Sequence, residues 1–423
     1  MTGNGSAEPH ERTSLLGQER NRREGILTTE APWLKNTRIW LRWPLRTVHL
    51  TWATLISNYV NVLLVFVPFG IVAGALRWND ATVFILNFFA IIPLASLLSF
   101  ATEELAATMG QTLGGLMNAT FGNAVELIVS IIALKDHEIR VVQASMLGSI
   151  LSNILLVLGC CFFVGGLRYH EQCFNSTVAS TMSSLMAVAS ASLIIPATLF
   201  AALSKSFKSD PETTKNHILF ISRGTAIILL VLYLMYLYFQ LKSHSDLFED
   251  SGSAENQEEV TEEEHLLNPF AAGVALVVVT ILVAICAEYL VGSIEGIVEK
   301  TGMSKTFIGL VLIPIVGNAA EHVTAVLVAY KNKMDLAIGV AIGSSLQIAL
   351  FVTPFLVILG WIMGENMTLH FQIFETVAFF ISGLVVTLLI QDGKSNYLEG
   401  GLCLGMYIIL AIAFYVYPDD VAQ

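Results

Sequence analysis

A series of long apolar stretches, separated by short polar ones, constrains the fold of this chain more than any other feature. About 20 consecutive apolar residues in a helix cross the roughly 30 Å hydrocarbon core of a bilayer. The 423 residues are 55% hydrophobic and 13% charged, with a mean hydropathy of +0.69. About eleven stretches of this kind can be delimited, at roughly 54–76, 82–101, 112–134, 141–166, 178–203, 217–241, 268–292, 303–329, 334–360, 370–390 and 396–417.

The stretches are rich in Leu, Ile, Val, Phe and Ala and lack the alternation of a barrel strand. Only helices then satisfy the backbone inside lipid, so the sequence predicts an all-α polytopic membrane protein with about eleven transmembrane helices. The largest polar pieces are the N-terminal tail and a loop near residues 242–267. Neither is large enough for a core of its own, so any activity must lie among the helices.

One motif occurs twice, as GNAVELIVS at 122–130 and GNAAEHVTA at 317–325. A second motif follows each copy at the same distance, LGSILSN in the first half and IGSSLQI in the second. Glu126 is 23 positions before Ser149 (149 − 126), and Glu321 is 23 positions before Ser344 (344 − 321). The shared register indicates a duplicated unit.

Each unit holds five of the predicted helices, and a unit with an odd number of crossings inserts with opposite topology the second time. The two intramembrane glutamates, Glu126 and Glu321, should therefore meet near the bilayer midplane. The predicted organisation is a cytosolic tail 1–53, a leading helix 54–76, a first five-helix repeat 77–241, an acidic cytosolic loop 242–267, a second, inverted five-helix repeat 268–418 and a C-terminal tail 419–423.

A charged carboxylate at the bilayer centre costs on the order of 3 kcal/mol or more, so it must be protonated, paired or bound to a cation. Neighbouring polar groups favour the cation. Glycines at positions 122 and 317 loosen the helix ahead of each glutamate. Neutral oxygens stand in matched register around both motifs, and the residues predicted to line a cation and proton site with Glu126 and Glu321 are Asn123, Asn318, Ser149, Ser152, Ser344 and Gln347.

Two carboxylates with several neutral oxygens make a hard-cation site of formal charge about −2, as Ca²⁺ prefers. Zinc or copper would recruit His or Cys, and the five cysteines show no metal spacing. If the same carboxylates hold either one Ca²⁺ or protons, the loaded site is near neutral and the empty one is penalised by desolvation. Such a site exchanges one kind of ion for the other and does not cross the membrane empty.

Three further residues are predicted to lie on a proton or cation path. Glu103 in ATEELA and Glu288 in CAEYLV form a looser pair, because their spacings to the main motif differ (126 − 103 = 23 and 321 − 288 = 33). His322 adjoins Glu321 and is either a hydrogen-bonded packing residue or a proton-linked group.

The paired motifs, with LGSILSN and SFATEELA, resemble the repeat signatures of the calcium/cation antiporters, and the chain is similar to the vacuolar Ca²⁺/H⁺ exchangers of the CAX type. The resemblance covers about residues 54–418. It implies one leading helix plus two inverted five-helix repeats, no cofactor, and export of cytosolic Ca²⁺ into an acidic organelle in exchange for H⁺. It also implies that Glu126 and Glu321 bind both ions and that Glu103 lies on the ion path.

The loop LFEDSGSAENQEEVTEEEH is the most acidic part of the chain. A helix there would place five glutamates on one face, and their mutual repulsion would make that helix conditional on a bound cation. The family resemblance implies an acidic helix that gathers Ca²⁺ at the cytosolic mouth, and a solvated linker is the alternative. The residues concerned are Glu255, Glu258, Glu259, Glu262 and Glu263.

Lys and Arg residues are concentrated before the first apolar stretch, which predicts a cytosolic N-terminus and, after eleven crossings, a lumenal C-terminus. The tail also carries Glu11, Leu15 and Leu16 in the form of an acidic dileucine sorting signal, which would bring in a sorting adaptor as a partner. The expected partners are thus Ca²⁺, H⁺ and the bilayer, without nucleic acid, and a homo-oligomer stays open.

Rival functions remain at this point. A Na⁺-coupled Ca²⁺ exchanger or a Mn²⁺/H⁺ exchanger would use a similar site, and a cation channel also needs intramembrane acids. The inverted repeat with one glutamate in each half favours alternating access over a channel. An enzyme is not expected, because no nucleophile and base pair or HExxH motif is present.

Overall fold

The computed structural model describes residues 59–109, 111–206, 211–245 and 269–418. Within these ranges the chain is almost entirely helical, as predicted. Both predicted tails and nearly all of the acidic loop lie outside the described residues. The predictions for Glu11, Leu15 and Leu16 and for Glu255, Glu258, Glu259, Glu262 and Glu263 therefore concern parts that the structure does not describe.

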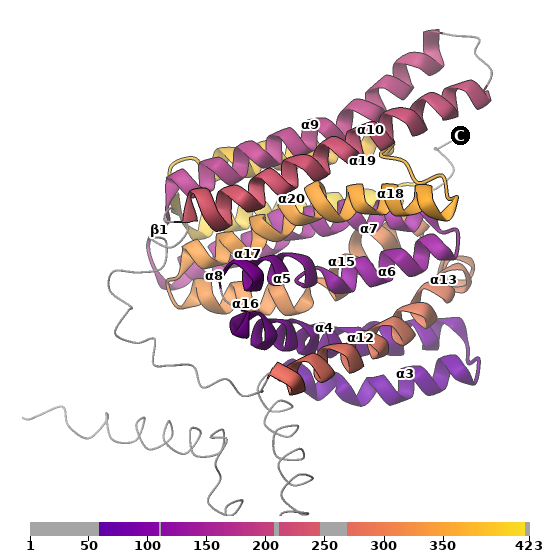
Figure 1. The fold of residues 1–423 in the computed structure, drawn as a ribbon, viewed down its shortest axis with the longest axis horizontal. Helices are drawn as coiled ribbons and strands as arrows, with labels where there is room; N and C mark the ends of the chain where they lie inside the picture. The colour runs from indigo at the N-terminus through magenta and orange to yellow at the C-terminus, as the bar shows by residue number, and fades with distance from the viewer. Residues whose placement is uncertain (1–58, 110, 207–210, 246–268, 419–423) are drawn as a thin grey trace, which may run out of the picture.

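Helices of the first half run side by side in a bundle (Figure 1). Their bounds follow the predicted apolar stretches; η1 is a 3₁₀ helix, and η2 and η3 are π-helical turns. In chain order they are η1 (Tyr59–Val65), α3 (Phe66–Ala75), α4 (Asp80–Thr108), α5 (Gln111–Phe121), α6 (Ala124–Lys135), α7 (Ile139–Leu151), η2 (Ser152–Val157), α8 (Leu158–Arg168), α9 (Ser176–Ser206), α10 (Pro211–Tyr238) and η3 (Phe239–Ser243).

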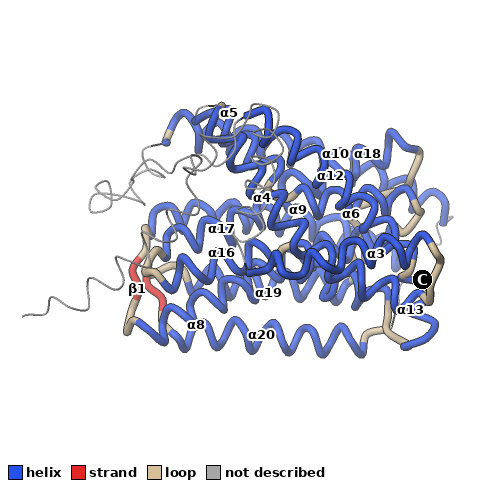
Figure 2. Tube along the Cα trace, turned by 90° about the horizontal axis from the view of Figure 1, so that it is seen from below, coloured by secondary structure: helices blue, strands red, loops and turns tan. Residues whose placement is uncertain are grey.

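The second half adds a matching set of helices, and Figure 2 shows the long ones of both halves running in the same general direction. In chain order they are α12 (Pro269–Gly292), α13 (Ile294–Thr301), α14 (Lys305–Phe307), η5 (Ile308–Leu312), α15 (Ile313–Gly317), α16 (Ala319–Tyr330), α17 (Met334–Gln347), η6 (Ile348–Val352), α18 (Thr353–Met363), α19 (Ile373–Leu389) and α20 (Tyr397–Val416).

Seven of these helical runs are long and apolar enough to cross a membrane, and an eighth is formed if a bent pair counts as one span. The bent pair is Lys305–Gly317 with Ala319–Tyr330, at an angle of 58°. Two shorter apolar helices, Val60–Ala75 and Ile373–Leu389, accompany them. The molecule is therefore a polytopic helical membrane protein of seven to eight candidate spans by length and composition.

Large apolar side chains point outward from the bundle, as a lipid-facing surface requires. Ile228 and Leu234 on α10 are 62% and 63% exposed, and Ile409 and Ile412 on α20 are similarly exposed. In an aqueous protein an exposed apolar surface of this extent would cause aggregation, whereas acyl chains cover it at no cost. The buried core joins both halves and includes α4 packed along α12.

Two predicted stretches, 112–134 and 303–329, are broken just ahead of their glutamates. The first breaks between α5 and α6 at Gly122 and Asn123, and the second breaks between α15 and α16 at Asn318. Glycine and asparagine tolerate the non-helical backbone that a break needs better than other residues do. The loosening expected from the glycines is thus a full interruption of each helix.

The helix boundaries repeat along the chain with a constant offset. Helix α6 begins and ends at 124 and 135, and α16 begins and ends at 319 and 330, which is 195 positions later (319 − 124 = 195). The next helices begin at 139 and 334, after a residue in the left-handed region, His137 or Asn332. The same offset separates Glu126 from Glu321.

Loops gather in two groups at opposite ends of the bundle. At one end Lys305 lies 2.7 Å from Glu138, and Lys300 lies 3.6 Å from Asp80. At the other end the strands β1 (Gln172–Cys173) and β2 (Lys394–Ser395) pair antiparallel, with Gln172 opposite Ser395. The strand pair therefore joins a loop of the first half to a loop of the second half.

Candidate cation site

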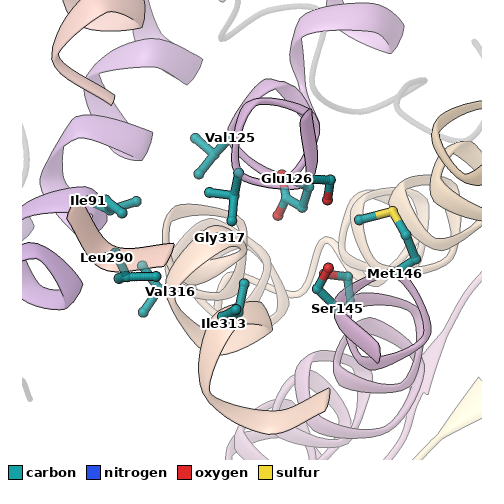
Figure 3. A pocket seen from close by; sticks show the side chains of 12 residues that line it. Ile91, Val125, Glu126, Ser145, Met146, Leu290, Ile313, Val316 and Gly317 are labelled. Carbon is teal, nitrogen blue, oxygen red and sulfur yellow. The ribbon is translucent and has the colours of Figure 1, made fainter. Parts of the chain in front are cut away.

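Glu126 is buried inside the helical bundle, in the first turn of α6, with 6% of its surface exposed. Its side chain lies against the break of the other half, because a Cβ added at Gly317 would be 2.7 Å from Glu126 Oε1. A cavity of about 10 Å³, roughly the room of one water molecule, adjoins the carboxylate (Figure 3). It is lined by residues from both halves, which include Ser130, Ser145, Met146, Ser149, Leu290 and Ile313.

Glu321 occupies the matching position in the first turn of α16. It lies near Ser344 and within electrostatic reach of Glu126. Its second carboxylate oxygen, Oε2, is buried and finds no hydrogen-bond partner among the described residues. Both predicted glutamates are therefore brought to one centre, and one of their oxygens is left without a protein donor.

Both carboxylates lie at helix N-termini, where the backbone N–H groups and the helix dipole favour negative charge. Glu126 is the third residue of α6, and Glu321 is the third residue of α16. The break of each predicted span creates these N-termini inside the bundle. The interruption therefore stabilises the ionised carboxylates that a cation needs as ligands.

Polar side chains of the two halves join beside the glutamates. Asn123 Nδ2 donates to Gln347 Oε1 at 2.6 Å, and Ser344 Oγ donates to Asn123 Oδ1 at 2.9 Å. Asn153 Nδ2 donates to Ser344 Oγ at 3.0 Å. Three of the residues predicted from the sequence thus form one network, and Asn153 extends it.

Asn318, the counterpart of Asn123, differs from it in its hydrogen bonds. It is fully buried, and neither Nδ2 nor Oδ1 has a hydrogen-bond partner among the described residues. A buried amide without partners costs about 1–3 kcal/mol. This cost and the orphaned oxygen of Glu321 indicate a ligand that bonds to oxygen atoms at this point.

The remaining predicted residues of the second motifs lie close by. Ser149 lines the cavity of Glu126. Ser152 Oγ is 3.3 Å from His322 Nε2, so the histidine adjoins the site and has a hydrogen-bond partner. Ser152 also begins η2, and Gln347 directly precedes η6. Such π-helical turns free backbone carbonyl groups and are frequent at functional sites.

Glu103 and Glu288 are not brought together. Glu103 is exposed in α4 and accepts a hydrogen bond from Ser99 Oγ at 3.1 Å. Glu288 is 60% exposed, near the opposite end of the bundle, where Lys135 Nζ lies 3.6 Å from it. The two side chains lie toward different ends of the adjacent helices α4 and α12, and the looser spacing of their motifs in the sequence agrees with this separation.

Among the described residues no three His, Cys, Asp or Glu side chains gather as a metal site. The centre is thus a pair of carboxylates surrounded by neutral oxygens. Sequence reasoning missed Asn153, Ser145 and Ser130 as parts of this centre. Asn153 directly follows Ser152 in the second motif, and Ser145 is one helical turn before Ser149, so helical periodicity around the motifs contained a signal for both.

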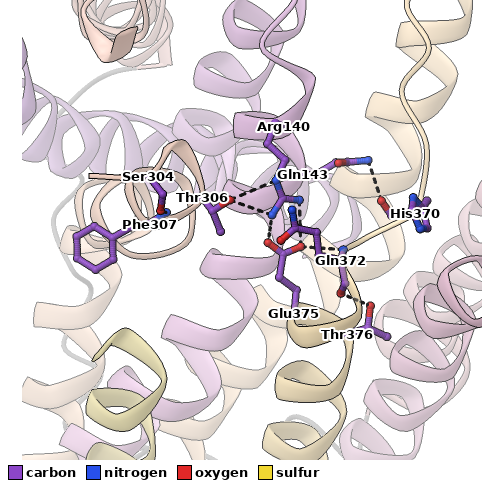
Figure 4. A network of polar contacts seen from close by, with 9 residues as sticks. All are labelled: Arg140, Gln143, Ser304, Thr306, Phe307, His370, Gln372, Glu375 and Thr376. Atoms are coloured by element: carbon purple, nitrogen blue, oxygen red, sulfur yellow. Dashed lines mark hydrogen bonds and ion pairs between the residues drawn. The ribbon is translucent and has the colours of Figure 1, made fainter. Parts of the chain in front are cut away.

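A second polar network lies outside the cavity, at the end of the bundle where Lys305 pairs with Glu138 (Figure 4). Arg140 on α7 pairs with Glu375 on α19, whose carboxylate is fully buried. The guanidinium also donates to Thr306 Oγ1 at 3.1 Å. Gln143 Nε2 donates to the Thr368 carbonyl at 2.9 Å. These contacts connect α7, α14 and α19. No motif in the sequence predicted them.

The fold and the centre define a polytopic helical transporter, in which two interrupted helices bring one carboxylate each to a shared buried site. A family described as sodium/calcium exchanger protein matches residues 80–242 and 271–416, and the chain belongs to this family. The resemblance inferred from the paired motifs is confirmed. The family consists of transporters and not of catalytic enzymes.

Individual relatives cover most of the chain. It is 51% identical over 375 residues to the vacuolar calcium ion transporter of Schizosaccharomyces pombe, which spans 89% of each chain. It is 46% identical over 365 residues to a Ca²⁺/H⁺ antiporter of Aphanothece halophytica, across 84% of this chain and 96% of the relative. The solved structure of native YfkE superposes with a TM-score of 0.71 at 38% identity and covers 85% of this chain and 100% of that one.

Proposed function

We propose that this protein is a secondary antiporter that moves cytosolic Ca²⁺ into an acidic organelle in exchange for H⁺. The observation that supports it most strongly is the buried pair Glu126 and Glu321, each at the N-terminus of an interrupted helix. The unsatisfied oxygen of Glu321 and the unpartnered Asn318 match a cation with oxygen ligands. The names of the Schizosaccharomyces pombe and Aphanothece halophytica relatives support Ca²⁺ and protons as the two ions.

The proposed architecture has eleven crossings. They comprise the seven long apolar helices, the bent pair, the two shorter apolar helices and the interrupted pair α5 and α6. The constant offset of 195 positions supports two inverted five-helix repeats after a leading helix. The pairing of loops at the two ends also supports an alternating path of the chain through the bilayer.

The mechanism follows from the charge of the pair. One Ca²⁺ neutralises two carboxylates, and so do two protons, whereas two bare carboxylates in a buried centre are disfavoured by desolvation. The site therefore changes its exposure only when one kind of ion occupies it. Acid on the lumenal side protonates Glu126 and Glu321 and displaces Ca²⁺, and the higher pH of the cytosol removes the protons before Ca²⁺ binds again.

Protons suit this centre better than Na⁺ as the coupling ion. Several Na⁺ ions would need additional acidic ligands, whereas the second motifs contribute Ser149, Ser152, Ser344 and Gln347, all neutral. His322, at 3.3 Å from Ser152, is placed to take part in proton movement. A Mn²⁺/H⁺ exchanger is the second candidate, because Mn²⁺ also accepts oxygen ligands.

The same proposal assigns the remaining parts of the chain. The N-terminus faces the cytosol and the C-terminus the lumen, and the acidic loop gathers Ca²⁺ at the cytosolic mouth. A vacuolar or similar acidic membrane is the proposed location, as the relatives' names suggest. We also propose sorting through the dileucine pattern in the N-terminal tail and assembly into homo-oligomers.

The test is ⁴⁵Ca²⁺ uptake into sealed proteoliposomes with an acidic interior. Uptake driven by the pH gradient should occur in the wild type and disappear in both Glu126→Gln and Glu321→Gln. The control Glu299→Gln, at an exposed position of α13, should behave as wild type. Uptake driven by a Na⁺ gradient alone would contradict proton coupling, and uptake that survives either glutamate substitution would contradict the site.

Competition by Mn²⁺ in the same vesicles distinguishes a Ca²⁺/H⁺ exchanger from a Mn²⁺/H⁺ exchanger. Unlabelled Mn²⁺ at a concentration equal to that of Ca²⁺ should leave most of the ⁴⁵Ca²⁺ uptake intact. If Mn²⁺ suppresses uptake more strongly than unlabelled Ca²⁺ does, the Mn²⁺/H⁺ exchanger is the better description.

A further inference from the structure

Arg223 is a charged residue inside an apolar span, and the cation site does not use it. It lies on α10, in the span Lys215–Ser243, where its side chain is half-buried. Its guanidinium carbon is 4.6 Å from the centroid of the Trp361 ring on α18. A cation over the face of a tryptophan ring is attracted by the ring electrons. Arg223 is therefore held at the seam between α10 and α18.

The neighbours of Arg223 indicate its level in the bilayer. Trp361 is two residues before the end of α18 at Met363. The loop after α18 folds back onto α10, where Leu369 N donates to Oγ of Ser222, the residue before Arg223, at 3.0 Å. Figure 1 shows α9 and α10 projecting from the bundle at this end. An arginine and a tryptophan at the end of a span lie where the acyl chains meet the polar headgroups.

No carboxylate among the described residues balances the charge of Arg223. Its guanidinium forms neither an ion pair nor a hydrogen bond with any of these residues. Glu365, the acidic residue of the loop after α18, lies 2.9 Å from His137 Nδ1 instead. The contact with the face of Trp361 leaves the five N–H donors of the guanidinium available. A cation at the edge of the lipid without an acceptor is costly, so this position is complementary to an anion.

An exposed apolar surface continues from Arg223 toward the middle of the bilayer. Ile227 and Val231 follow on the same side of α10, about 6 Å and 12 Å further along the helix axis. They are 50% and 52% exposed. At Gly224, next to Arg223, no described atom lies within 4 Å of an added Cβ. A cation at headgroup level above exposed apolar side chains matches a molecule with an anionic head and apolar chains.

We propose that Arg223 and Trp361 form a binding site for an anionic phospholipid, with the phosphate on the guanidinium and an acyl chain along Ile227 and Val231. A planar guanidinium can bind two phosphate oxygens while its face stacks on an aromatic ring. In phosphatidylcholine the choline cation compensates the phosphate, whereas phosphatidylglycerol keeps a net negative charge. A single arginine therefore favours the anionic lipid, which would be held at the seam between α10 and α18.

The first test measures the affinity of the purified, delipidated full chain for phosphatidylglycerol by native mass spectrometry. Arg223→Gln should bind the first phosphatidylglycerol about tenfold more weakly than the wild type, because the charged hydrogen bonds to the phosphate are lost. The matched control is Arg77→Gln, which removes an exposed arginine from the turn between α3 and α4 and should bind as the wild type does. Equal affinity of Arg223→Gln and wild type, or an equal loss in Arg77→Gln, overturns the proposal.

The second test divides the ligand into its parts and follows thermal unfolding in detergent. Phosphatidylglycerol should raise the unfolding midpoint of the wild type by about 2 °C or more, and Arg223→Gln should lose most of this shift. Diacylglycerol, which lacks the phosphate, and inorganic phosphate, which lacks the acyl chains, should each have a much smaller effect at the same concentration. If diacylglycerol is as effective, the phosphate contact is wrong, and if inorganic phosphate is as effective, the site binds a free anion and not a lipid.

A double-variant cycle tests whether the two residues act as one site. Trp361→Leu should weaken the binding of phosphatidylglycerol, because the guanidinium loses the ring that holds it. The same change in the Arg223→Gln background should cause little further loss. Additive losses would mean that the two side chains act independently and would overturn the shared site. None of these measurements involves transport, so their outcome does not depend on the proposed function.

Discussion

Equivalent residues at the candidate cation site differ in how many of their polar atoms have hydrogen-bond partners. Asn123 has partners for both ends of its amide, whereas its counterpart Asn318 has none among the described residues. The fully bonded amide holds the two halves together, and we propose that the unbonded one contributes to the cation site. This difference between equivalent positions leads to opposite expectations for stability and function.

Asn318→Ala should leave the free energy of unfolding unchanged or raise it by up to about 1 kcal/mol, because it removes a buried unpaired amide. It should weaken Ca²⁺ binding about tenfold. Asn123→Ala should instead lower the free energy of unfolding by about 1–3 kcal/mol, because Ser344 and Gln347 lose their partner. Thermal unfolding in detergent, with and without Ca²⁺, measures both effects, and equal destabilisation by the two variants would contradict this reading.

The ion pair of Arg140 and Glu375 is expected to matter for stability. Glu375 is fully buried and Arg140 is 22% exposed, so removal of the arginine leaves a buried carboxylate without its charge partner. Arg140→Ala should destabilise the protein by about 3–5 kcal/mol. Unfolding by heat in detergent reports the loss. A double variant, Arg140→Met with Glu375→Leu, should recover much of it, and failure to recover any would point to another role for the pair.

His370 gives the protein a pH dependence outside the membrane spans. Burial and the nearby charge of Arg140 lower the pKa of His370 below its ordinary value. A histidine whose pKa is lower in the folded state contributes stability that is lost as the pH falls below about 6.5 toward the folded value. His370→Gln should therefore reduce the loss of thermal stability between pH 7 and pH 5. An identical pH profile in variant and wild type would exclude this contribution.

At the scale of elements, the interruptions before the glutamates decide what the site can do. An unbroken helix through 112–134 would satisfy its own backbone and place Glu126 in mid-helix, without the N–H groups of a helix N-terminus. The same holds for Glu321 at the start of α16. Each break therefore divides one span into two half-helices, and the N-termini of α6 and α16 lie at the proposed cation site.

Gly317→Ala tests the close contact at the second break. The added methyl group would be 2.7 Å from Glu126 Oε1, so the carboxylate must shift, and the alanine also favours a continuous helix. The expected result is a Ca²⁺ affinity lowered about tenfold with an unchanged amount of folded protein. The measurement is the concentration dependence of ⁴⁵Ca²⁺ uptake. Gly401→Ala, at an open position of α20, is the control.

The helices and the two glutamates could be predicted from the sequence, whereas the contacts between distant residues could not. The apolar stretches gave the helices to within a few residues at most of their ends, because length and hydropathy are set by the bilayer. The two glutamates and their oxygen-bearing neighbours followed from repeated motifs. The network of Arg140, Thr306 and Glu375 could not be predicted, because its members are single residues far apart in the chain whose proximity depends on tertiary packing.

The different packing of equivalent glycines could not be predicted from the sequence either. Gly148 and Gly343 occupy equivalent positions in the two motifs, and their residue type is the same. The structure shows that Gly148 packs against the backbone of Leu310, whereas no described atom lies within 4 Å of a Cβ added at Gly343, which is also buried. A repeated motif predicts equal residue types and does not predict equal packing, because packing depends on the neighbouring helices.

For the whole molecule, the proposed path through the bilayer makes a prediction about its two termini. The visible C-terminal end of α20 lies at the same end of the bundle as α13 (Figure 2). In sealed organelle vesicles with the cytosolic side outward, an N-terminal epitope tag should be digested by added protease and a C-terminal tag should be protected. Digestion of both tags without detergent would require an even number of crossings and would contradict the eleven-helix arrangement.

The short strand pair at one end of the bundle limits the kind of motion that opens it. Gln172 and Ser395 come from different halves, and the ladder that joins them ties the loop before α9 to the loop before α20. A rigid separation of the two halves at this end of the bundle would break the hydrogen bonds of the strand pair. Under the proposed function, a path to the site is therefore expected to open by movement of helices inside this frame, while the loops joined by the strand pair stay together.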